Sequence, residues 1–374
     1  MIKVLNFLTD TNIGGAGRLL IHYLKNFDRN KFEVYVALPE GSLLKPEVEK
    51  TGYSVIEMKN GKDRSFELAS VFEAMKIIRS LRPDIVHCHA SLSARLAAYL
   101  CGIRSRIYTR HCAYDLPESA KKFPKKQISG LINNTLSTAI IAVADAAADN
   151  LTDTGVKKAK ITTIQNGVEP LRKLSEEGKA ILRAELGIKG ETVLLINARL
   201  TEVKGHDILL NAFRKVLQKH PNTKLIILGT GEEEERLKKL AVELGVSDNT
   251  VFTGFVNDVA PYINIADVNV NCSWGTETSS LAISEAMTLS VPTVASDFGG
   301  NPGMIDNGIN GLLVPKKNSD ALAATLTELI SSPEKIREMG NNAERIFRER
   351  FTSAAMTKKL EAVYEQEVKR FTKK

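Results

Sequence analysis

The stretch Val268–Met287, VNVNCSWGTETSSLAISEAM, decides how the rest of the chain is interpreted. It begins with a short run typical of a buried strand, and the residues from Leu281 onward have the composition of a helix. A loop rich in Ser and Thr joins the two, and Ser279 or Ser280 is placed to cap the start of the helix. The stretch therefore predicts one strand–loop–helix unit of an α/β fold.

The same alternation of strands and helices extends to both sides of this unit. Continuous apolar strands separated by amphipathic helices are typical of a parallel sheet that is covered on both faces. The expected strands are Lys3–Leu8, Phe32–Leu38, Asp84–Cys88, Arg106–Thr109, Ala139–Val143, Ile161–Ile164, Thr192–Asn197, Lys224–Leu228, Val268–Asn271, Pro292–Ala295 and Leu312–Val314. The expected helices include Arg18–Phe27, Phe66–Leu81, Ser91–Leu100, Asp207–Lys219, Glu232–Leu244 and Leu281–Leu289.

The alternation pauses near Asn166–Pro170, where a turn signal precedes a charged segment. A chain of 374 residues is comfortable for two doubly wound units and too long for one. We therefore expect an α/β protein with two Rossmann-like, doubly wound parallel-sheet domains, residues 1–168 and 169–351, that face each other across a cleft.

The net charge of +7 is confined to the first half of the chain. Residues 1–170 contain 24 Lys and Arg against 17 Asp and Glu, whereas the remainder contains 27 of each. Part of this excess comes from Lys121, Lys122, Lys125 and Lys126. Such a cluster is either a solvated face or a contact to an anionic surface such as phospholipid headgroups. Nucleic-acid binding is disfavoured because the chain has no aromatic-interleaved basic motif.

The sequence also bears on the compartment. No cleavable signal follows the opening residues 1–8, and no stretch approaches the roughly 20 apolar residues of a membrane span. We therefore expect a cytoplasmic protein, with the four lysines as its candidate contact to the inner face of the membrane. The four cysteines include no Cys-x-x-Cys pair and are expected to be reduced thiols.

Two glutamates flank the start of the helix that begins near Leu281. The amides of Ser280 and Leu281 suit a phosphate, because the first amides of a helix have no partner within it. Glu285 lies about one turn inside the helix, where it can reach a ribose diol, and Glu277 lies just before it. Two carboxylates disfavour a simple phosphate site but suit the hydroxyls at both ends of a nucleotide sugar. A capped helix with two incidental glutamates is the alternative.

Two further loops suit a diphosphate. Arg199 and Lys204 follow the first strand of the second half, and both can hold phosphate oxygens without a metal. Gly14 and Gly15 follow the first strand of the chain and allow the backbone to approach a ligand. The glycine loop matches neither a dinucleotide fingerprint nor a P-loop. Taken alone, Arg199 and Lys204 would be ordinary surface residues of a loop, and the glycine loop is equally compatible with a tight turn between a strand and a helix.

These loops, in this order, resemble those of the family 4 retaining glycosyltransferases of GT-B fold, and among them the bacterial enzymes of cell-surface polysaccharide synthesis. The resemblance covers essentially the whole chain. Its most specific parts are the spacing from Glu277 to Glu285, the pair Arg199 and Lys204, and the loop Asp297–Pro302. Thr278 departs from the family, which often has glycine at that point, and this leaves the identity of the sugar open.

The resemblance implies transfer of a sugar from a nucleotide diphosphate sugar, by default a UDP-sugar, to a glycan or lipid-linked acceptor, with retention and without a metal or other cofactor. It also implies that a final helix, at about residues 352–374, packs back on the first domain. The residues that it assigns to the donor are Arg199 and Lys204 (diphosphate), Glu285 (ribose), Glu277, Ser280 and Leu281 (sugar and phosphate), Gly14 and Gly15 (diphosphate), and His111 (sugar).

The pair His87 and His89 looks at first like a metal site. We expect the two side chains to point to opposite faces of a strand, which argues against shared ligation. No Asp-x-Asp sequence, the usual ligand set of metal-dependent glycosyltransferases, occurs in the chain. Alternatives to a glycosyltransferase are a nucleotide-sugar epimerase of similar fold, a nicotinamide oxidoreductase, which lacks its fingerprint here, and a non-catalytic partner subunit.

Overall fold

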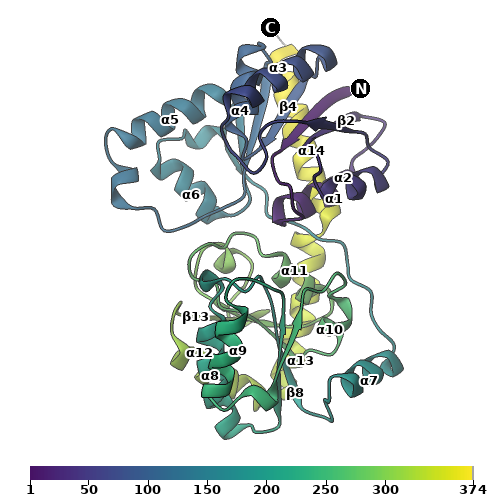
Figure 1. The fold of residues 1–374 in the computed structure, drawn as a ribbon, viewed down its shortest axis with the longest axis vertical. Helices are drawn as coiled ribbons and strands as arrows, with labels where there is room; N and C mark the ends of the chain where they lie inside the picture. The colour runs from purple at the N-terminus through teal and green to yellow at the C-terminus, as the bar shows by residue number, and fades with distance from the viewer. Residues whose placement is uncertain (373–374) are drawn as a thin grey trace. The chain divides into compact units, whose positions relative to one another are not determined.

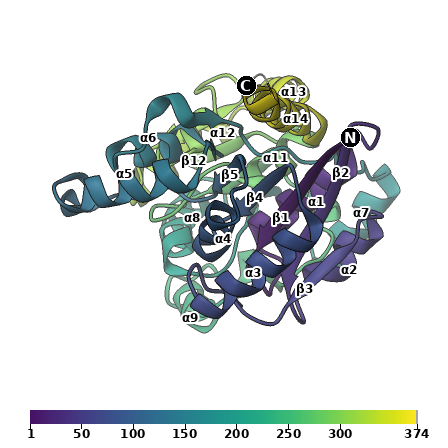
Figure 2. The same cartoon turned by 90° about the horizontal axis from the view of Figure 1, so that it is seen from above.

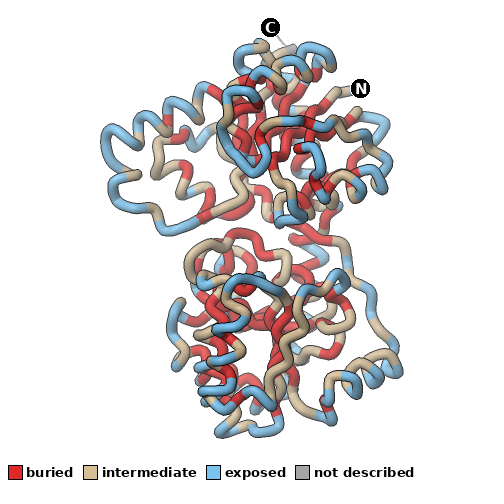
Figure 3. Tube along the Cα trace, viewed as in Figure 1, coloured by how far each residue is buried: buried red, intermediate tan, exposed pale blue. Residues whose placement is uncertain are grey.

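The computed structural model describes residues 1–372, which divide into two compact units. The first unit contains Met1–Glu169 and the chain from Ser353 onward, and the second contains Pro170–Thr352. Each unit is a parallel β-sheet with helices on both faces (Figure 1). The strands are the most deeply buried parts of both units (Figure 3).

The first unit has a seven-stranded sheet in the order β3-β2-β1-β4-β5-β6-β7. Every neighbouring pair is parallel, so each connection crosses over the sheet. The strands are β1 (Ile2–Leu8), β2 (Phe32–Pro39), β3 (Val55–Met58), β4 (Ile85–His89), β5 (Ser105–Arg110), β6 (Ala139–Ala142) and β7 (Ile161–Thr163). The helices are α1 (Gly15–Asn26), α2 (Leu44–Lys50), α3 (Leu68–Leu81), α4 (Leu92–Leu100), α5 (Lys125–Leu136), α6 (Asp145–Asp153) and α14 (Ser353–Thr372).

Helices cover both faces of this sheet, as Figure 2 shows from above. Apolar side chains of α1, α2 and α14 form one core with one face of the strands, and those of α3 and α4 form a second core on the other face. Helix α14, the last of the chain, contributes Met356, Leu360, Val363 and Tyr364 to the first of these cores. The last helix of the chain therefore completes the hydrophobic core on one face of the N-terminal sheet.

The second unit repeats this plan with a six-stranded parallel sheet in the order β10-β9-β8-β11-β12-β13. Its strands are β8 (Thr192–Asn197), β9 (Thr223–Leu228), β10 (Thr250–Gly254), β11 (Val268–Asn271), β12 (Thr293–Ser296) and β13 (Gly311–Val314). Its helices are α7 (Glu176–Glu185), α8 (His206–Lys219), α9 (Glu234–Glu243), α10 (Ala260–Asn264), α11 (Leu281–Thr288), α12 (Ser319–Ile330) and α13 (Pro333–Ile346), which continues into a π-helical turn at Phe347–Phe351.

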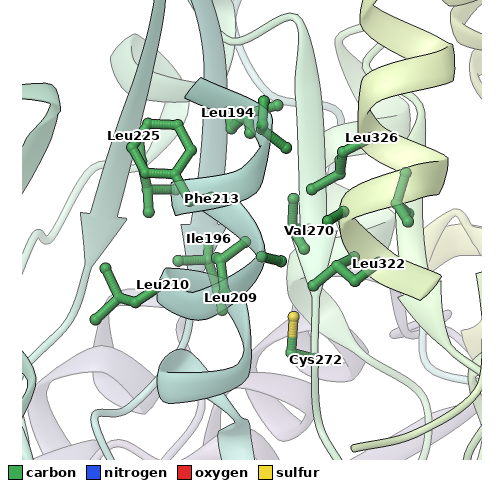
Figure 4. Packing of buried hydrophobic residues seen from close by; sticks show 14 of the residues in the cluster. Leu194, Ile196, Leu209, Leu210, Phe213, Leu225, Val270, Cys272, Leu322 and Leu326 are labelled. Atoms are coloured by element: carbon green, nitrogen blue, oxygen red, sulfur yellow. The ribbon is translucent and has the colours of Figure 1, made fainter. Parts of the chain in front are cut away.

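The larger core of the second unit lies between its sheet and helices α8, α9 and α12. Figure 4 shows Leu194 and Val270 of the sheet facing Phe213 of α8 and Leu326 of α12. All four side chains are almost fully buried. This close packing fixes the positions of the strands, and the site residues lie in the segments that follow those strands.

Each sheet has one point at which the order of its strands reverses. In the first unit this point lies between β1 and β4, and in the second it lies between β8 and β11. Ligands of open α/β sheets bind beyond the carboxyl ends of the strands at such points. The segments that follow these four strands are therefore the candidate site in each unit.

Candidate active site

The loop after β8 brings Lys204 to the end of β11. Gly205, directly after it, has φ 70°. A Cβ atom at Gly205 would lie 2.4 Å from the carbonyl oxygen of Cys272, so a side chain there would push the two segments apart. Glycine at position 205 therefore allows the loop to pack directly on the residues that follow β11.

Lys204 forms an ion pair with Glu277. Its Nζ lies 2.9 Å from Glu277 Oε2, and the two side chains are only 17% and 10% exposed. Glu277 Oε2 also accepts hydrogen bonds from Ser273 Oγ at 2.7 Å and from Asn271 Nδ2 at 3.3 Å. Burial alone would raise the pKa of Glu277, but Lys204 and these hydrogen bonds together lower it below its ordinary value. Glu277 is therefore an ionised carboxylate at neutral pH, with its Oε2 held by Lys204, Ser273 and Asn271.

The loop after β12 packs on the backbone of Glu277. Gly299 in this loop has φ 60°, and a Cβ atom there would lie 2.3 Å from the carbonyl oxygen of Glu277. Asn301, in the same loop, donates to the carbonyl oxygen of Ser296 at 3.0 Å. The Asp297–Pro302 loop, one of the motifs singled out in the sequence, is thus in direct contact with the segment that carries Glu277.

Ser280 caps helix α11, as one of the two expected capping residues. Its Oγ accepts a hydrogen bond from the amide of Ile283 at 3.4 Å. The helix begins at Leu281, so the amides of Leu281 and Ala282 have no acceptor within the helix. The positive end of the helix dipole lies at the same point, which suits an anionic ligand.

Glu285 lies one turn inside α11 and is 8% exposed. Asn197, the last residue of β8, donates from Nδ2 to Glu285 Oε2 at 3.2 Å. Both residues lie at the reversal point of the sheet, so Asn197 orients the Glu285 carboxylate there. The start of α11 therefore has one acidic side chain on either side of it, Glu277 before it and Glu285 inside it.

Arg199 is not part of this cluster. Its side chain is exposed, and within residues 1–372 we find no hydrogen bond or ion pair that holds it. The structure therefore brings Lys204, Glu277, Ser280, Leu281 and Glu285 together but leaves Arg199 at the rim of the same loop.

In the first unit, Gly14 and Gly15 lie at the start of helix α1. Gly14 is its N-cap residue and offers no side-chain cap, and Gly15 is the first helical residue. No other atom lies within 4 Å of the position that a Cβ atom of Gly15 would occupy. Packing within the unit therefore does not require glycine at position 15, and the space beside it is open to a ligand.

Three histidines of the first unit form a buried network. His87 lies between Tyr364 Oη at 2.7 Å and Thr109 Oγ1 at 2.6 Å. His89 Nδ1 lies 2.9 Å from His111 Nε2. Burial lowers the pKa of His87 to about 3 and that of His111 to about 4. These imidazoles are therefore neutral at physiological pH.

The expectation that His87 and His89 point to opposite faces of the strand was wrong. Their ring centroids are only 4.3 Å apart, because residues two positions apart in a strand share a face. Their nitrogen atoms are engaged by protein groups, including Asn6 Oδ1 at 3.4 Å from His89 Nε2. No group of three or more His, Cys, Asp or Glu side chains in residues 1–372 is arranged to hold a metal ion.

Four polar residues of these networks were missed in the sequence. Asn271 and Ser273 donate hydrogen bonds to Glu277, Asn197 donates one to Glu285, and Asn6 contacts His89. All of them lie in or just after strands that flank a reversal point. A polar residue near the end of an otherwise apolar strand is the signal that could have identified them.

Two family models match consecutive parts of the chain. The model described as Glycosyltransferase Family 4 matches residues 13–172, and the model described as Glycosyl transferases group 1 matches residues 178–346. The chain belongs to the family 4 glycosyltransferases. Each of the two structural units corresponds to one of these models, so the family signature extends over the glycine loop in the first unit and the acidic helix start in the second.

Known proteins similar to this glycosyltransferase cover most of its length. The putative glycosyltransferase EpsD of Bacillus subtilis is 28% identical over 91% of both chains. The alpha-monoglucosyldiacylglycerol synthase of Acholeplasma laidlawii is 27% identical over 89% of this chain and 88% of its own. Among solved structures, Anabaena HepE in complex with UDP matches with a TM-score of 0.84 and 22% identity over 98% of this chain and 100% of its own.

These comparisons confirm the fold that the sequence predicted for the glycosyltransferase, GT-B with two parallel-sheet α/β domains. In residues 1–372, no helix is long and apolar enough to span a membrane.

Proposed function

We propose that this glycosyltransferase moves a sugar, with retention, from a UDP-sugar to a glycan or lipid-linked acceptor in cell-surface polysaccharide synthesis, and that it needs no metal. The observation that carries the donor assignment is the cluster at the start of α11. There Lys204, Glu277 and Glu285 surround a helix N-terminus at the reversal point of the second sheet.

Each group of the cluster matches one part of a nucleotide sugar. Lys204 and the amides at Ser280 and Leu281 would meet the negative charge that develops on the leaving diphosphate, together with Arg199 from the rim of the same loop. The two carboxylates would accept hydrogen bonds from hydroxyls, Glu285 from the ribose and Glu277 from the sugar. Because Glu277 is ionised and held by Lys204, it also fixes the position of that lysine.

The nucleotide base is proposed from a structural neighbour. HepE, which has the same fold, is described in complexes with UDP and with UDP-glucose. HepE is 22% identical to this chain, and its complexes make a uridine nucleotide the first donor to test.

The first unit would contribute Gly14, Gly15 and His111. Open space beside Gly15 suits the approach of a diphosphate. His111, as a neutral imidazole, can exchange a hydrogen bond with a sugar hydroxyl without placing a positive charge beside a developing oxocarbenium ion. Lys204, Ser273 and Asn271 hold the Glu277 carboxylate in place, which disfavours it as a nucleophile and supports attack by the acceptor on the same face from which the diphosphate leaves.

The donor assignment is tested by a binding panel of UDP, GDP and ADP, with and without Mg²⁺. We expect UDP to raise the melting temperature by mass action and to bind equally well in the presence of EDTA. A requirement for Mg²⁺ would contradict the metal-independent mechanism. Absence of binding by all three nucleotides would contradict the donor site and would favour a non-catalytic subunit.

The acceptor side is proposed to touch an anionic membrane surface through helix α5 and the turn before it. Lys122, Lys125 and Lys126 lie in the same segment as exposed apolar side chains. Phe123 is 81% exposed and Leu131 is 69% exposed. The fourth lysine, Lys121, lies within 3.7 Å of the carboxylates of Glu118 and Asp153 and contributes less free charge. Exposed apolar side chains together with nearby cations suit anionic headgroups, and one relative is named for a glycolipid product.

The membrane proposal is tested by sedimentation with vesicles of phosphatidylglycerol. At about 1 kcal/mol per basic residue, the variant Lys122→Gln/Lys125→Gln/Lys126→Gln should bind about 100-fold more weakly. The matched control Lys59→Gln/Lys62→Gln/Lys76→Gln removes the same charge from exposed positions of the same unit and should bind like the parent protein. Equal binding by both variants would contradict the role of α5.

A further inference from the structure

A small polar pocket lies in the first unit, between β5 and helices α5 and α6. Its volume is about 100 Å³. Its lining contains no aspartate or glutamate, and it consists of Tyr108, Arg110, Tyr114, Leu116, Ser129, Asn133, Asn150, Leu151 and Thr154. The pocket is thus lined by one guanidinium, hydroxyl groups and amides, together with the side chains of Leu116 and Leu151.

The pocket is built on the opposite side of β5 from the histidine network. Tyr108 and Arg110 line the pocket, whereas the intervening Thr109 contacts His87 and the following His111 contacts His89. This is the alternation of a strand, continued past its last residue. The pocket therefore adjoins the segment that carries His111 without sharing a side chain with the donor residues.

Arg110 is held in the pocket wall by neutral groups. Its Nε donates to the carbonyl oxygen of Cys112 at 3.1 Å, and its Nη2 donates to Tyr114 Oη at 2.8 Å. Tyr108 and Tyr114, rather than a carboxylate, lie around it. In residues 1–372, no ion pair engages the Arg110 guanidinium.

A second arginine stands directly behind this wall. Arg95 of α4 is 6% exposed, lies 4.2 Å over the Tyr108 ring, and donates from Nη2 to Asn133 Oδ1 at 2.8 Å. Its Nε is buried without a hydrogen-bond partner. Burial, and to a smaller extent the like charge of Arg110, lower the pKa of Arg95, so the two guanidinium charges act on each other.

The two guanidinium groups of Arg95 and Arg110 thus carry positive charge with no carboxylate paired to either of them in residues 1–372. Guanidinium groups stay protonated in proteins, and a buried charge without a partner is costly. The contacts with tyrosine rings recover part of that cost but do not neutralise the charge. An anion in the pocket would neutralise it, and the Ser129 hydroxyl and the Asn150 amide can donate hydrogen bonds to it, whereas the Asn133 amide is engaged by Ser129 and Arg95.

We propose that this pocket binds an oxyanion, and that the oxyanion is a phosphate group of the acceptor. This assignment to the acceptor rests on the proposed transferase function, because the pocket adjoins His111 and lies outside the donor cluster. Phosphate fits better than carboxylate, because two guanidinium charges match a doubly charged group whose several oxygens can bond to the lining on more than one side.

Binding of inorganic phosphate tests the pocket itself. The titration is carried out by calorimetry at constant ionic strength with saturating UDP, so that the donor site is already filled. Loss of a charge-assisted hydrogen bond should weaken phosphate binding at least about tenfold in Arg110→Gln. The control Arg79→Gln, which removes the same charge from an exposed position on α3, should bind phosphate like the parent protein.

A second variant guards against a folding defect in Arg110→Gln. Tyr114→Phe removes only the hydroxyl that orients Arg110, and Tyr114 is 41% exposed, so the fold should be retained. We expect a few-fold loss of phosphate affinity and an unchanged melting temperature. If both Arg110→Gln and Tyr114→Phe bind phosphate as tightly as Arg79→Gln, the pocket is not an anion site.

The source of the oxyanion is tested with a hexose 1-phosphate, acetate and vesicles containing phosphatidic acid, each competing against inorganic phosphate. Tighter binding of the hexose phosphate, lost in Arg110→Gln, supports an acceptor phosphate. Tighter binding of inorganic phosphate, of acetate or of the vesicles would overturn that assignment. UDP binding is measured on the same samples to separate the two proposals. If only the pocket proposal is wrong, the protein still binds UDP. If only the donor-site proposal is wrong, Arg110→Gln still weakens phosphate binding.

Discussion

Replacing Lys204 by alanine is expected to lower the rate of sugar transfer at saturating donor by about 10²- to 10³-fold, as loss of a group that stabilises developing negative charge does in other enzymes. Lys204 is largely buried, like its partner Glu277, with side-chain exposures of 17% and 10%. It is therefore shielded from solvent, and water cannot replace its charge next to the diphosphate.

The same change is also expected to destabilise the second unit. The sequence alone suggests that a loop lysine holds little of the fold. The structure changes this expectation, because the variant would leave the buried Glu277 carboxylate without its cation. Breaking a fully buried pair costs about 3–5 kcal/mol, and because this pair is slightly exposed we expect a loss near the lower end of that range. Thermal unfolding of the Lys204→Ala variant, followed by the fluorescence of Trp274, measures this loss in the second unit.

A double variant separates the two effects. Lys204→Ala/Glu277→Gln removes the unpaired charge, so it should regain most of the lost stability, while the transfer rate stays low. Lys215→Ala, at a half-exposed ion pair on α8, is the control for loss of a surface lysine and should change neither property. Unchanged transfer kinetics in Lys204→Ala would contradict the proposed role of this residue.

Replacing Glu285 by alanine should weaken UDP binding about 10- to 100-fold, because a carboxylate that accepts hydrogen bonds from the ribose is lost. Glu285→Gln keeps one acceptor oxygen and should fall between the alanine variant and the parent protein. Glu243→Ala, at an exposed position of α9, is the charge-matched control. Calorimetric titration of UDP measures all three.

The ribose assignment has a chemical counterpart in the ligand. If Glu285 binds the ribose diol, the parent protein should prefer UDP over 2′-deoxy-UDP, and Glu285→Ala should bind both equally. If Glu285→Ala still prefers UDP over 2′-deoxy-UDP to the same extent, another residue binds the ribose 2′-hydroxyl.

Much of the fold could be predicted because its strands are buried on both faces. Thr192–Asn197 and Val268–Asn271 were predicted with their observed limits, since continuous apolar runs between turn residues mark such strands. Strands β3 and β10 were missed. Both lie at sheet edges, and their residues are mostly only half-buried, so the apolar signal is weak.

The donor motifs could be found because parallel strands bring their carboxyl ends together, so loops that are distant in sequence meet. The partners of these motifs could not be found in this way. The Lys204–Glu277 pair depends on the turn at Gly205, and the pocket around Arg110 depends on how α4, α5 and α6 pack on β5. The error over His87 and His89 was one of geometry, since a period of two places both on one face.

The return of α14 to the first sheet affects the order of events during synthesis. Met356, Leu360 and Tyr364 belong to the core of the N-terminal unit, and Tyr364 also contacts His87 of β4. The ribosome delivers these residues only after the whole second unit. Domains usually fold in the order in which they are made. Here the second unit has its full sequence first, and the N-terminal half must wait with an exposed apolar face until residues 353–372 emerge.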